Sequence, residues 1–253
     1  MSKADLIFAR PIMNAAGMLG FTPDPRAPVP WSDFGAFITN PVSLRPRRVT
    51  GHPALMPYPG GLLLHTGLPD PGFRAVVERY ARRWADSPMP VIVHLISDRP
   101  EEAKEMARRL EGLDNILALE LSFAPLLADD IIMFALDMCR GELPLIACLP
   151  PEQALRLGSR AMQAGAAAVS LAPPRGALMQ DGRPVAGRLF GPSVFPGVLE
   201  VVRSASKSGV TCIGAGGVTS KEDVDAMLGA GAIGVQIDTA LWLPREKVEG
   251  LVH

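Results

Sequence analysis

Eight short apolar runs, most of them separated by segments with a helical pattern, constrain the fold of this chain more than any other feature. The runs do not alternate between apolar and polar residues, so both of their faces must be covered, as in a parallel sheet. Parallel strands need long crossover connections, which are usually helices. The eight predicted strands are residues 11–16, 36–40, 91–96, 116–121, 143–149, 167–171, 210–214 and 234–237.

Helices are predicted between most of these runs. Residues 100–112 place their apolar side chains on one stripe and their acidic residues near the start. Pro151 suits the first turn of a helix, and Gly165 suits its end. Thr219 and Glu222 have the spacing of a capping box. Further helices are expected at residues 73–86, 127–140 and 193–207.

Eight strands alternating with helices predict an α/β chain that forms one (β/α)₈ TIM barrel domain over residues 1–253. An open, doubly wound parallel sheet is the alternative. Residues 41–72 are rich in Pro and Gly and are expected to form a long loop. In a barrel this loop follows the second strand at the C-terminal mouth, where ligands bind.

Composition excludes several classes of partner. With 25 Lys+Arg against 26 Asp+Glu, the chain offers no basic face for nucleic acid. No apolar run approaches the roughly 18 residues of a membrane-spanning helix. The 3 cysteines lack the spacing of a zinc site, and their low number indicates a reducing compartment. We therefore expect a soluble, cytoplasmic protein without a metal, a membrane partner or a nucleic acid partner.

A glycine-rich segment, residues 214–217, directly follows the seventh predicted strand and precedes a helix. Glycines let backbone N–H groups approach an anion, and barrels commonly bind phosphate at this position. The segment is therefore either a phosphate cradle, completed by Thr239 after the eighth strand, or a tight turn. Asp238 brings a carboxylate close to the expected phosphate, which is unfavourable unless it points away.

These segments resemble the dihydroorotate dehydrogenase family, which binds FMN in a (β/α)₈ barrel. The resemblance extends in order over nearly the whole chain, at residues 14–17, 37–46, 59–62, 66–72, 191–192, 214–218 and 236–240. It implies an FMN cofactor, a small-molecule substrate, a homodimer and, as in some members, a partner subunit. The residues that it places around FMN are Ala15, Ala16, Gly17, Asn40, Gly191, Gly216, Gly217, Asp238 and Thr239.

Several positions depart from the family's pattern. Asn40 and Cys148 stand where the family has lysines, the second of which supplies positive charge beside reduced flavin. Within residues 121–125, Ala124 best matches the family's Cys or Ser base, and Ser122 is the only hydroxyl. Asp238 replaces a phosphate-binding glycine. The phosphate cradle is thus partly kept, whereas the polar cage for orotate is largely replaced, which disfavours dihydroorotate oxidation.

Four side chains are candidates for catalysis. His94 closes the third predicted strand, where it would act as an acid, a base or a hydrogen-bond donor to flavin, or serve as a structural histidine. His65 in the long loop either contacts a ligand or lies on the surface. Ser122 is the hydroxyl nearest the family's base position. Cys148 is either a nucleophile or a small buried hydrophobe.

For three charged residues, the sequence gives weaker indications of a role in the site. Glu120 is expected to face outward or to pair with a cation on a helix. Arg175 and Arg188, in the long segment after the sixth strand, either cover an anion or are solvated.

Three functions follow from these patterns. The first is an FMN-dependent oxidoreductase acting on a small molecule. The second is a non-catalytic or repurposed barrel that binds another phosphorylated ligand or serves as a partner subunit. The third is a genuine dihydroorotate dehydrogenase with a rearranged site.

Overall fold

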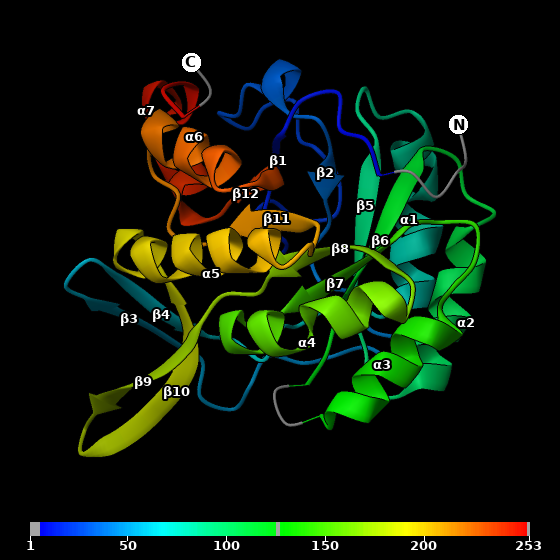
Figure 1. Ribbon diagram of the computed structural model, residues 1–253, viewed down its shortest axis with the longest axis horizontal. Coiled ribbons are helices and arrows are strands. Elements are labelled where there is room, and N and C mark those ends of the chain that lie inside the picture. Colours follow the sequence, from blue (N-terminus) through cyan, green and yellow to red (C-terminus); the bar gives the residue numbers. More distant parts are fainter. Residues whose placement is uncertain (1–5, 125–126, 252–253) are drawn as a thin grey trace.

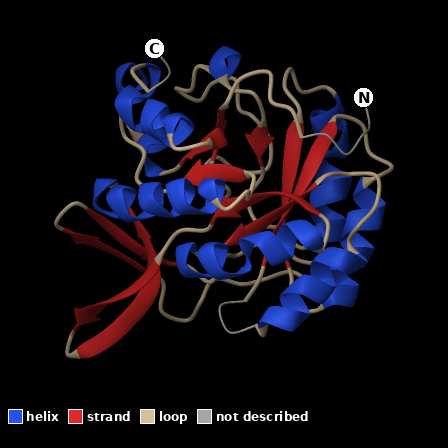
Figure 2. Cartoon of the chain, in the orientation of Figure 1, coloured by secondary structure: helices blue, strands red, loops and turns tan. Residues whose placement is uncertain are grey.

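Eight parallel strands form the central sheet of the computed structural model, which describes residues 6–124 and 127–251 (Figures 1 and 2). Met13 in the first strand of the sheet forms a parallel bridge with Ala36, beside the last strand. This bridge brings the two edges together, so the sheet is a nearly closed barrel and the predicted fold class is confirmed. In sheet order, the strands are β1 (Ile12–Asn14), β12 (Ala232–Ile237), β11 (Cys212–Ala215), β8 (Ala166–Leu171), β7 (Leu145–Leu149), β6 (Ile116–Ser122), β5 (Val91–Ile96) and β2 (Phe37–Ile38).

Helices lie around the outside of this barrel (Figure 1). They are α1 (Phe73–Ala85), α2 (Pro100–Leu110), α3 (Asp129–Met138), α4 (Pro151–Gln163), α5 (Phe195–Lys207), α6 (Lys221–Gly229) and α7 (Arg245–Glu249). The crossover from β1 to β2 contains only the 3₁₀ turn η1 (Trp31–Asp33), in a stretch interrupted by prolines. Among the described residues, no helix has the length and apolar character needed to cross a lipid bilayer.

The start of α6 differs from the prediction by one residue. Ser220, not Thr219, is the N-cap, and its hydroxyl accepts a hydrogen bond from Asp223 N at 3.2 Å. The Asp223 carboxylate in turn accepts one from Ser220 N at 3.0 Å, which completes a capping box. The motif emphasises Glu at the N3 position, but Asp223 fills that position here and makes the same hydrogen bond. The predicted pair of Thr219 and Glu222 was wrong for this reason.

A second, antiparallel sheet lies beside the mouth of the barrel, in the order β3-β4-β10-β9. The expectation of a loop over residues 41–72 was wrong in its middle, because β3 (Ala54–Tyr58) and β4 (Gly61–His65) form a hairpin there. This hairpin pairs with a second one, β9 (Arg175–Gln180) and β10 (Arg183–Phe190). Local patterns do not reveal it, since β4 and β10 lie more than a hundred residues apart.

The barrel interior has two layers. Strand periodicity places one apolar residue of every strand except β12 in the lower layer, together with Ala36, which directly precedes β2, and the layer is fully buried. That layer consists of Met13, Ala36, Ile38, Ile92, Ala118, Ile146, Ala168 and Ile213. Residues two positions further along each strand point the same way, one layer closer to the C-terminal mouth. The site described next is built from that upper layer.

Candidate functional site

Two neighbouring strands, β5 and β6, bring the first polar side chains of the upper layer together. His94 follows Ile92 by two positions on β5, and Glu120 follows Ala118 by two on β6. The two strands pair in a register that places His94 opposite Glu120. The expectation that Glu120 faces outward was therefore wrong: its side chain points into the barrel. The strand period, counted from the apolar layer, carried this signal.

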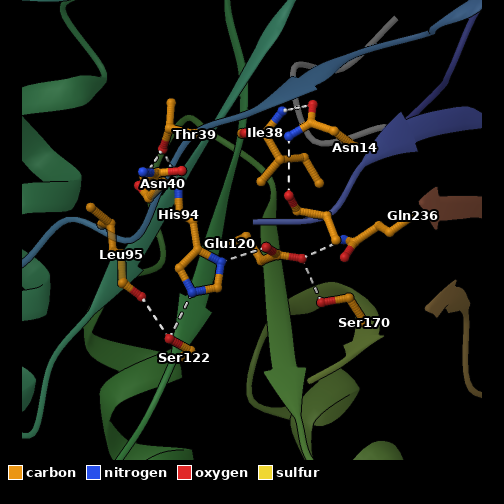
Figure 3. A network of polar contacts seen from close by, with 11 residues as sticks. Asn14, Ile38, Thr39, Asn40, His94, Leu95, Glu120, Ser122, Ser170 and Gln236 are labelled. Atoms are coloured by element: carbon orange, nitrogen blue, oxygen red, sulfur yellow. Dashed lines mark hydrogen bonds and ion pairs between the residues drawn. The ribbon is translucent and has the colours of Figure 1, made fainter. Parts of the chain in front are cut away.

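His94 has a hydrogen-bond partner on each ring nitrogen (Figure 3). Its Nδ1 lies 2.5 Å from Glu120 Oε2, and its Nε2 lies 2.8 Å from Ser122 Oγ. His94 is 5% exposed and Glu120 is 0% exposed, whereas Ser122 is only partly buried. A carboxylate, an imidazole and a hydroxyl, hydrogen-bonded in that order, form a relay that can move a proton between the barrel interior and its mouth.

Glu120 is the fixed negative charge of this cluster. Its other oxygen, Oε1, accepts hydrogen bonds from Ser170 Oγ and Gln236 Nε2, both at 2.6 Å. Burial alone would raise the pKa of Glu120, but His94 and the donors from Ser170 and Gln236 together lower it. The carboxylate is therefore ionised at neutral pH and is positioned to stabilise a positive charge on His94.

A cavity of about 320 Å³ opens above this cluster at the C-terminal ends of the strands. Its wall is largely apolar, with a few charged groups, which is typical of a small-molecule site. Both sheets contribute to it. The predicted site residues that line it are His94, His65, Ser122, Cys148, Ala15, Ala16, Gly216 and Asp238. Ala124 lies in the wall too, whereas Pro125 lies outside the described residues.

The other residues predicted to surround FMN do not line the cavity. Asn40 accepts a hydrogen bond from Gly20 N at 3.0 Å and so anchors the loop after β1. Gly191 and Gly217 lie against each other, since a Cβ on Gly217 would lie 2.6 Å from Gly191 O. The residues of this group are Gly17, Asn40, Gly191, Gly217 and Thr239.

The corner expected to bind phosphate is occupied by the Asp238 carboxylate. Oδ2 accepts a hydrogen bond from Gly217 N at 3.1 Å, and Oδ1 accepts from Thr239 N at 2.5 Å and from Thr239 Oγ1 at 3.1 Å. Asp238 is 3% exposed, and burial raises its pKa. The amides of the predicted cradle thus already hold an anion that belongs to the chain, and a phosphate beside it would meet a buried carboxylate.

This corner therefore does not fit the phosphate of FMN. The tight turn explains both glycines without a ligand: Gly216 and Gly217 have φ values of +109° and +71°, which favour glycine. A Cβ on Gly217 would also lie 2.8 Å from Phe195 N, so the close approach of α5 requires glycine here.

Cys148 lies beside the polar cluster at the end of β7. Burial, and then the Glu120 carboxylate, raise the pKa of its thiol well above the ordinary range. The thiol is therefore neutral near pH 7, which does not favour a nucleophilic thiolate. Ligand atoms of His94, Glu120 and Cys148 lie within 4.8 Å of one another, so among the described residues this trio has the spacing of a set of metal ligands.

The fold and this site define an α/β-barrel protein whose ligand cavity lies at the C-terminal ends of the strands, where barrel enzymes have their active sites. The family model "Dihydroorotate dehydrogenase" matches residues 2–126. The chain is also 30% identical, over 265 residues, to the "Dihydroorotate dehydrogenase B (NAD(+)), catalytic subunit" of Pelobacter propionicus. That alignment covers 96% of this chain and 87% of the relative.

Two further relatives have the same name. The protein of Pyrococcus furiosus is 30% identical, with 97% of this chain and 90% of the relative covered. The protein of Geotalea daltonii is 31% identical, with 92% and 84% covered. The chain belongs to the dihydroorotate dehydrogenase family, a family of oxidoreductases whose members typically bind FMN. The family resemblance of the sequence is thus confirmed.

Proposed function

We propose that this family member is a repurposed barrel that binds a small organic molecule in the mouth cavity and transfers a proton to or from it through Ser122 and His94. The observation that supports this most directly is the double contact of His94, with Glu120 on one ring nitrogen and Ser122 on the other. The closed corner at Asp238 is the reason for assigning the site a chemistry that does not depend on an FMN phosphate.

The relay assigns a separate role to each residue. The ionised Glu120 accepts the Nδ1–H of His94, which leaves Nε2 as the basic nitrogen that faces Ser122. When Ser122 takes a proton from a bound ligand, its own hydroxyl proton passes to Nε2. Glu120 then stabilises the imidazolium, and the reverse transfer returns the proton. The ligand loses one proton and His94 gains one, so the step is balanced.

Hydrogen–deuterium exchange into bound ligands tests this proposal. Small organic acids and carbonyl compounds that raise the melting temperature are incubated with the protein in D₂O, and deuterium incorporation is followed by NMR. General acid–base catalysis contributes roughly 10²–10⁴-fold, so His94→Gln and Ser122→Ala should slow the exchange by about 100-fold or more. The exposed Arg183→Gln variant is the control and should exchange at the wild-type rate. Equal exchange in His94→Gln and wild type, or no exchange with any ligand that binds, would contradict the proposal.

An FMN-dependent oxidoreductase is the second candidate, and membership of a family whose members typically bind FMN supports it. A visible absorption spectrum separates the two. Purified wild type that carries flavin, or that binds added FMN at a 1:1 ratio, favours this candidate. Colourless protein that does not bind FMN favours the repurposed barrel.

We also propose a partner subunit and a homodimer for this chain. The relatives are named as catalytic subunits, which supports the first. Light scattering on the purified chain and co-purification from its source test the two separately, and a monomer that co-purifies with nothing contradicts both.

A further inference from the structure

Arg188 is a partly buried cation that lines the mouth cavity. Within residues 6–124 and 127–251, no carboxylate lies at salt-bridge distance from its guanidinium, in contrast to the arginines that pair with a nearby acid on a helix, such as Arg74 with Glu78 and Arg109 with Glu105. Its neighbour across the β9–β10 hairpin is Arg175, which is directly opposite in the strand register and lines the same cavity. Arg175 and Arg188 therefore place two like charges side by side on one wall of the cavity, and among the described residues neither forms an ion pair with the carboxylates that also line it, Asp98, Glu120 and Asp238.

Such an arrangement is unfavourable in the absence of a ligand. Burial, and then the positive charge of Arg175, lower the pKa of Arg188 to about 10, so the group is still charged at neutral pH. A desolvated cation that keeps its charge gains most from an anion that enters the cavity.

The backbone around Arg188 fixes its position. The preceding residue, Gly187, lies so close to β4 that a Cβ there would approach Leu63 Cδ2 to 2.5 Å. The guanidinium carbon of Arg188 also lies 5.9 Å from the centre of the Phe190 ring, two residues along the same strand. The β9–β10 hairpin (Figure 1), which pairs with β4, thus holds this side chain in the cavity wall.

We propose that Arg188, assisted by Arg175, binds the anionic group of the ligand, which is an organic oxyanion: a carboxylate or a phosphate ester. The apolar part of the ligand would lie against Leu64, Phe123 and Leu171, which line the same cavity. A guanidinium offers two parallel N–H donors to an oxyanion, which suits both ligand chemistries. The inference rests on the proposed function, because it names the substrate class of the same cavity.

Matched aromatic probes test the charge requirement. Benzoate and phenyl phosphate share a ring and carry the two oxyanions, and benzamide is the neutral analogue of benzoate. Titration calorimetry on the full-length protein should show binding of at least one anion and at least tenfold weaker binding of benzamide. Arg188→Gln should weaken anion binding at least tenfold, and Arg188→Lys should weaken it less, because lysine keeps the charge without the planar fork. Which anion binds more tightly decides between the two ligand sources.

Arg183→Gln is the matched control, since Arg183 lies on the same strand, is exposed and does not line the cavity. Its anion affinity should equal that of wild type. Equal binding of benzoate and benzamide, an unchanged affinity in Arg188→Gln, or no anion binding at tens of millimolar would each overturn the inference. His94→Gln keeps both arginines, so it should bind anions normally even though proton exchange is lost. This variant therefore distinguishes a failure of anion binding by Arg188 and Arg175 from a failure of the proton relay.

Discussion

Two buried carboxylates, Glu120 and Asp238, line the same cavity, and their surroundings differ. Glu120 accepts hydrogen bonds from side chains, including a histidine that can carry a proton. Asp238 accepts mainly from the backbone amides of Gly217 and Thr239, which do not take up or release a proton near neutral pH. The pKa of Glu120 is lowered, whereas that of Asp238 is raised.

These surroundings indicate a different role for each carboxylate. The cluster of side chains around Glu120 ends in Ser122, which lies in the cavity wall where it can contact a ligand. A carboxylate held by glycine-turn amides takes the place of an external anion and closes the corner. The part of the site beside Ser122 thus stays open for chemistry, whereas the corner at Asp238 has become part of the fold.

Removal of Glu120 should have the largest effect on stability. Glu120→Ala leaves His94, Ser170 and Gln236 without their shared acceptor in a fully buried position. We expect the free energy of unfolding to fall by about 3–5 kcal/mol, as for other broken buried pairs. Urea unfolding measures it.

Glu120→Gln and Glu101→Gln complete this test. Glu120→Gln keeps an acceptor for Ser170 and Gln236 and should cost less stability, yet should still abolish proton exchange, because it no longer fixes the His94 tautomer. Glu101 is exposed on α2, so Glu101→Gln should change neither property. If Glu120→Ala is as stable as Glu101→Gln, the cluster does not contribute to the fold.

Asp238→Gly should open the closed corner. The amides of Gly217 and Thr239 lose their acceptor, so we expect a loss of about 1–3 kcal/mol in the free energy of unfolding. Inorganic phosphate or FMN should then raise the melting temperature of the variant but not that of wild type, by binding to the native state alone. Phosphate that stabilises both proteins equally would show that Asp238 does not close the corner.

The pH dependence of stability should separate the two carboxylates by sign. The pKa of Glu120 is lowered from 4.5, so its stabilising contribution is present above that value and is lost as pH falls. The pKa of Asp238 is raised from 3.8, so its contribution is present below that value and is lost as pH rises through the higher, folded-state pKa.

Replacing each carboxylate with a neutral amide tests how it contributes to the pH dependence of stability. Between pH 3 and pH 6, Glu120→Gln should flatten the rise of stability with pH relative to wild type, and Asp238→Asn should steepen it. Unfolding free energies from urea titrations across that range give both slopes. Changes of the same sign in the two variants would contradict the assigned surroundings.

The barrel and several of the polar residues at its mouth can be predicted from the sequence. The eight apolar runs predict the barrel, because covered parallel strands leave little alternative. His94, Ser122 and Asp238 could be singled out as strand-end polar residues, and the warning that Asp238 disfavours a phosphate follows from its charge alone.

The partners of these residues could not be predicted in the same way. His94 meets Glu120 only through the β5–β6 register, and a shift of either strand by one residue would turn that strand's side chain outward. The β9–β10 hairpin that supports Arg188 depends on pairing with β4, a contact between distant segments. Whether Asp238 points toward or away from Gly217 depends on one side-chain torsion, which a sequence does not encode locally.

The smallest effect is expected for a single donor to Glu120. Ser170→Ala removes a 2.6 Å hydrogen bond in a fully buried position and should lower the free energy of unfolding by about 1–3 kcal/mol, toward the lower end because Gln236 still donates to the same oxygen. Ser204→Ala is the matched control, since Ser204 donates to Glu200 at 2.8 Å on the surface and its loss should cost well under 1 kcal/mol. Ser170→Ala should also slow the proton relay slightly, because Glu120 then holds its charge less firmly against burial. Equal costs for the two serines would mean that burial adds nothing to the hydrogen bonds around Glu120, and the contrast with the backbone-held Asp238 would then lose its energetic basis.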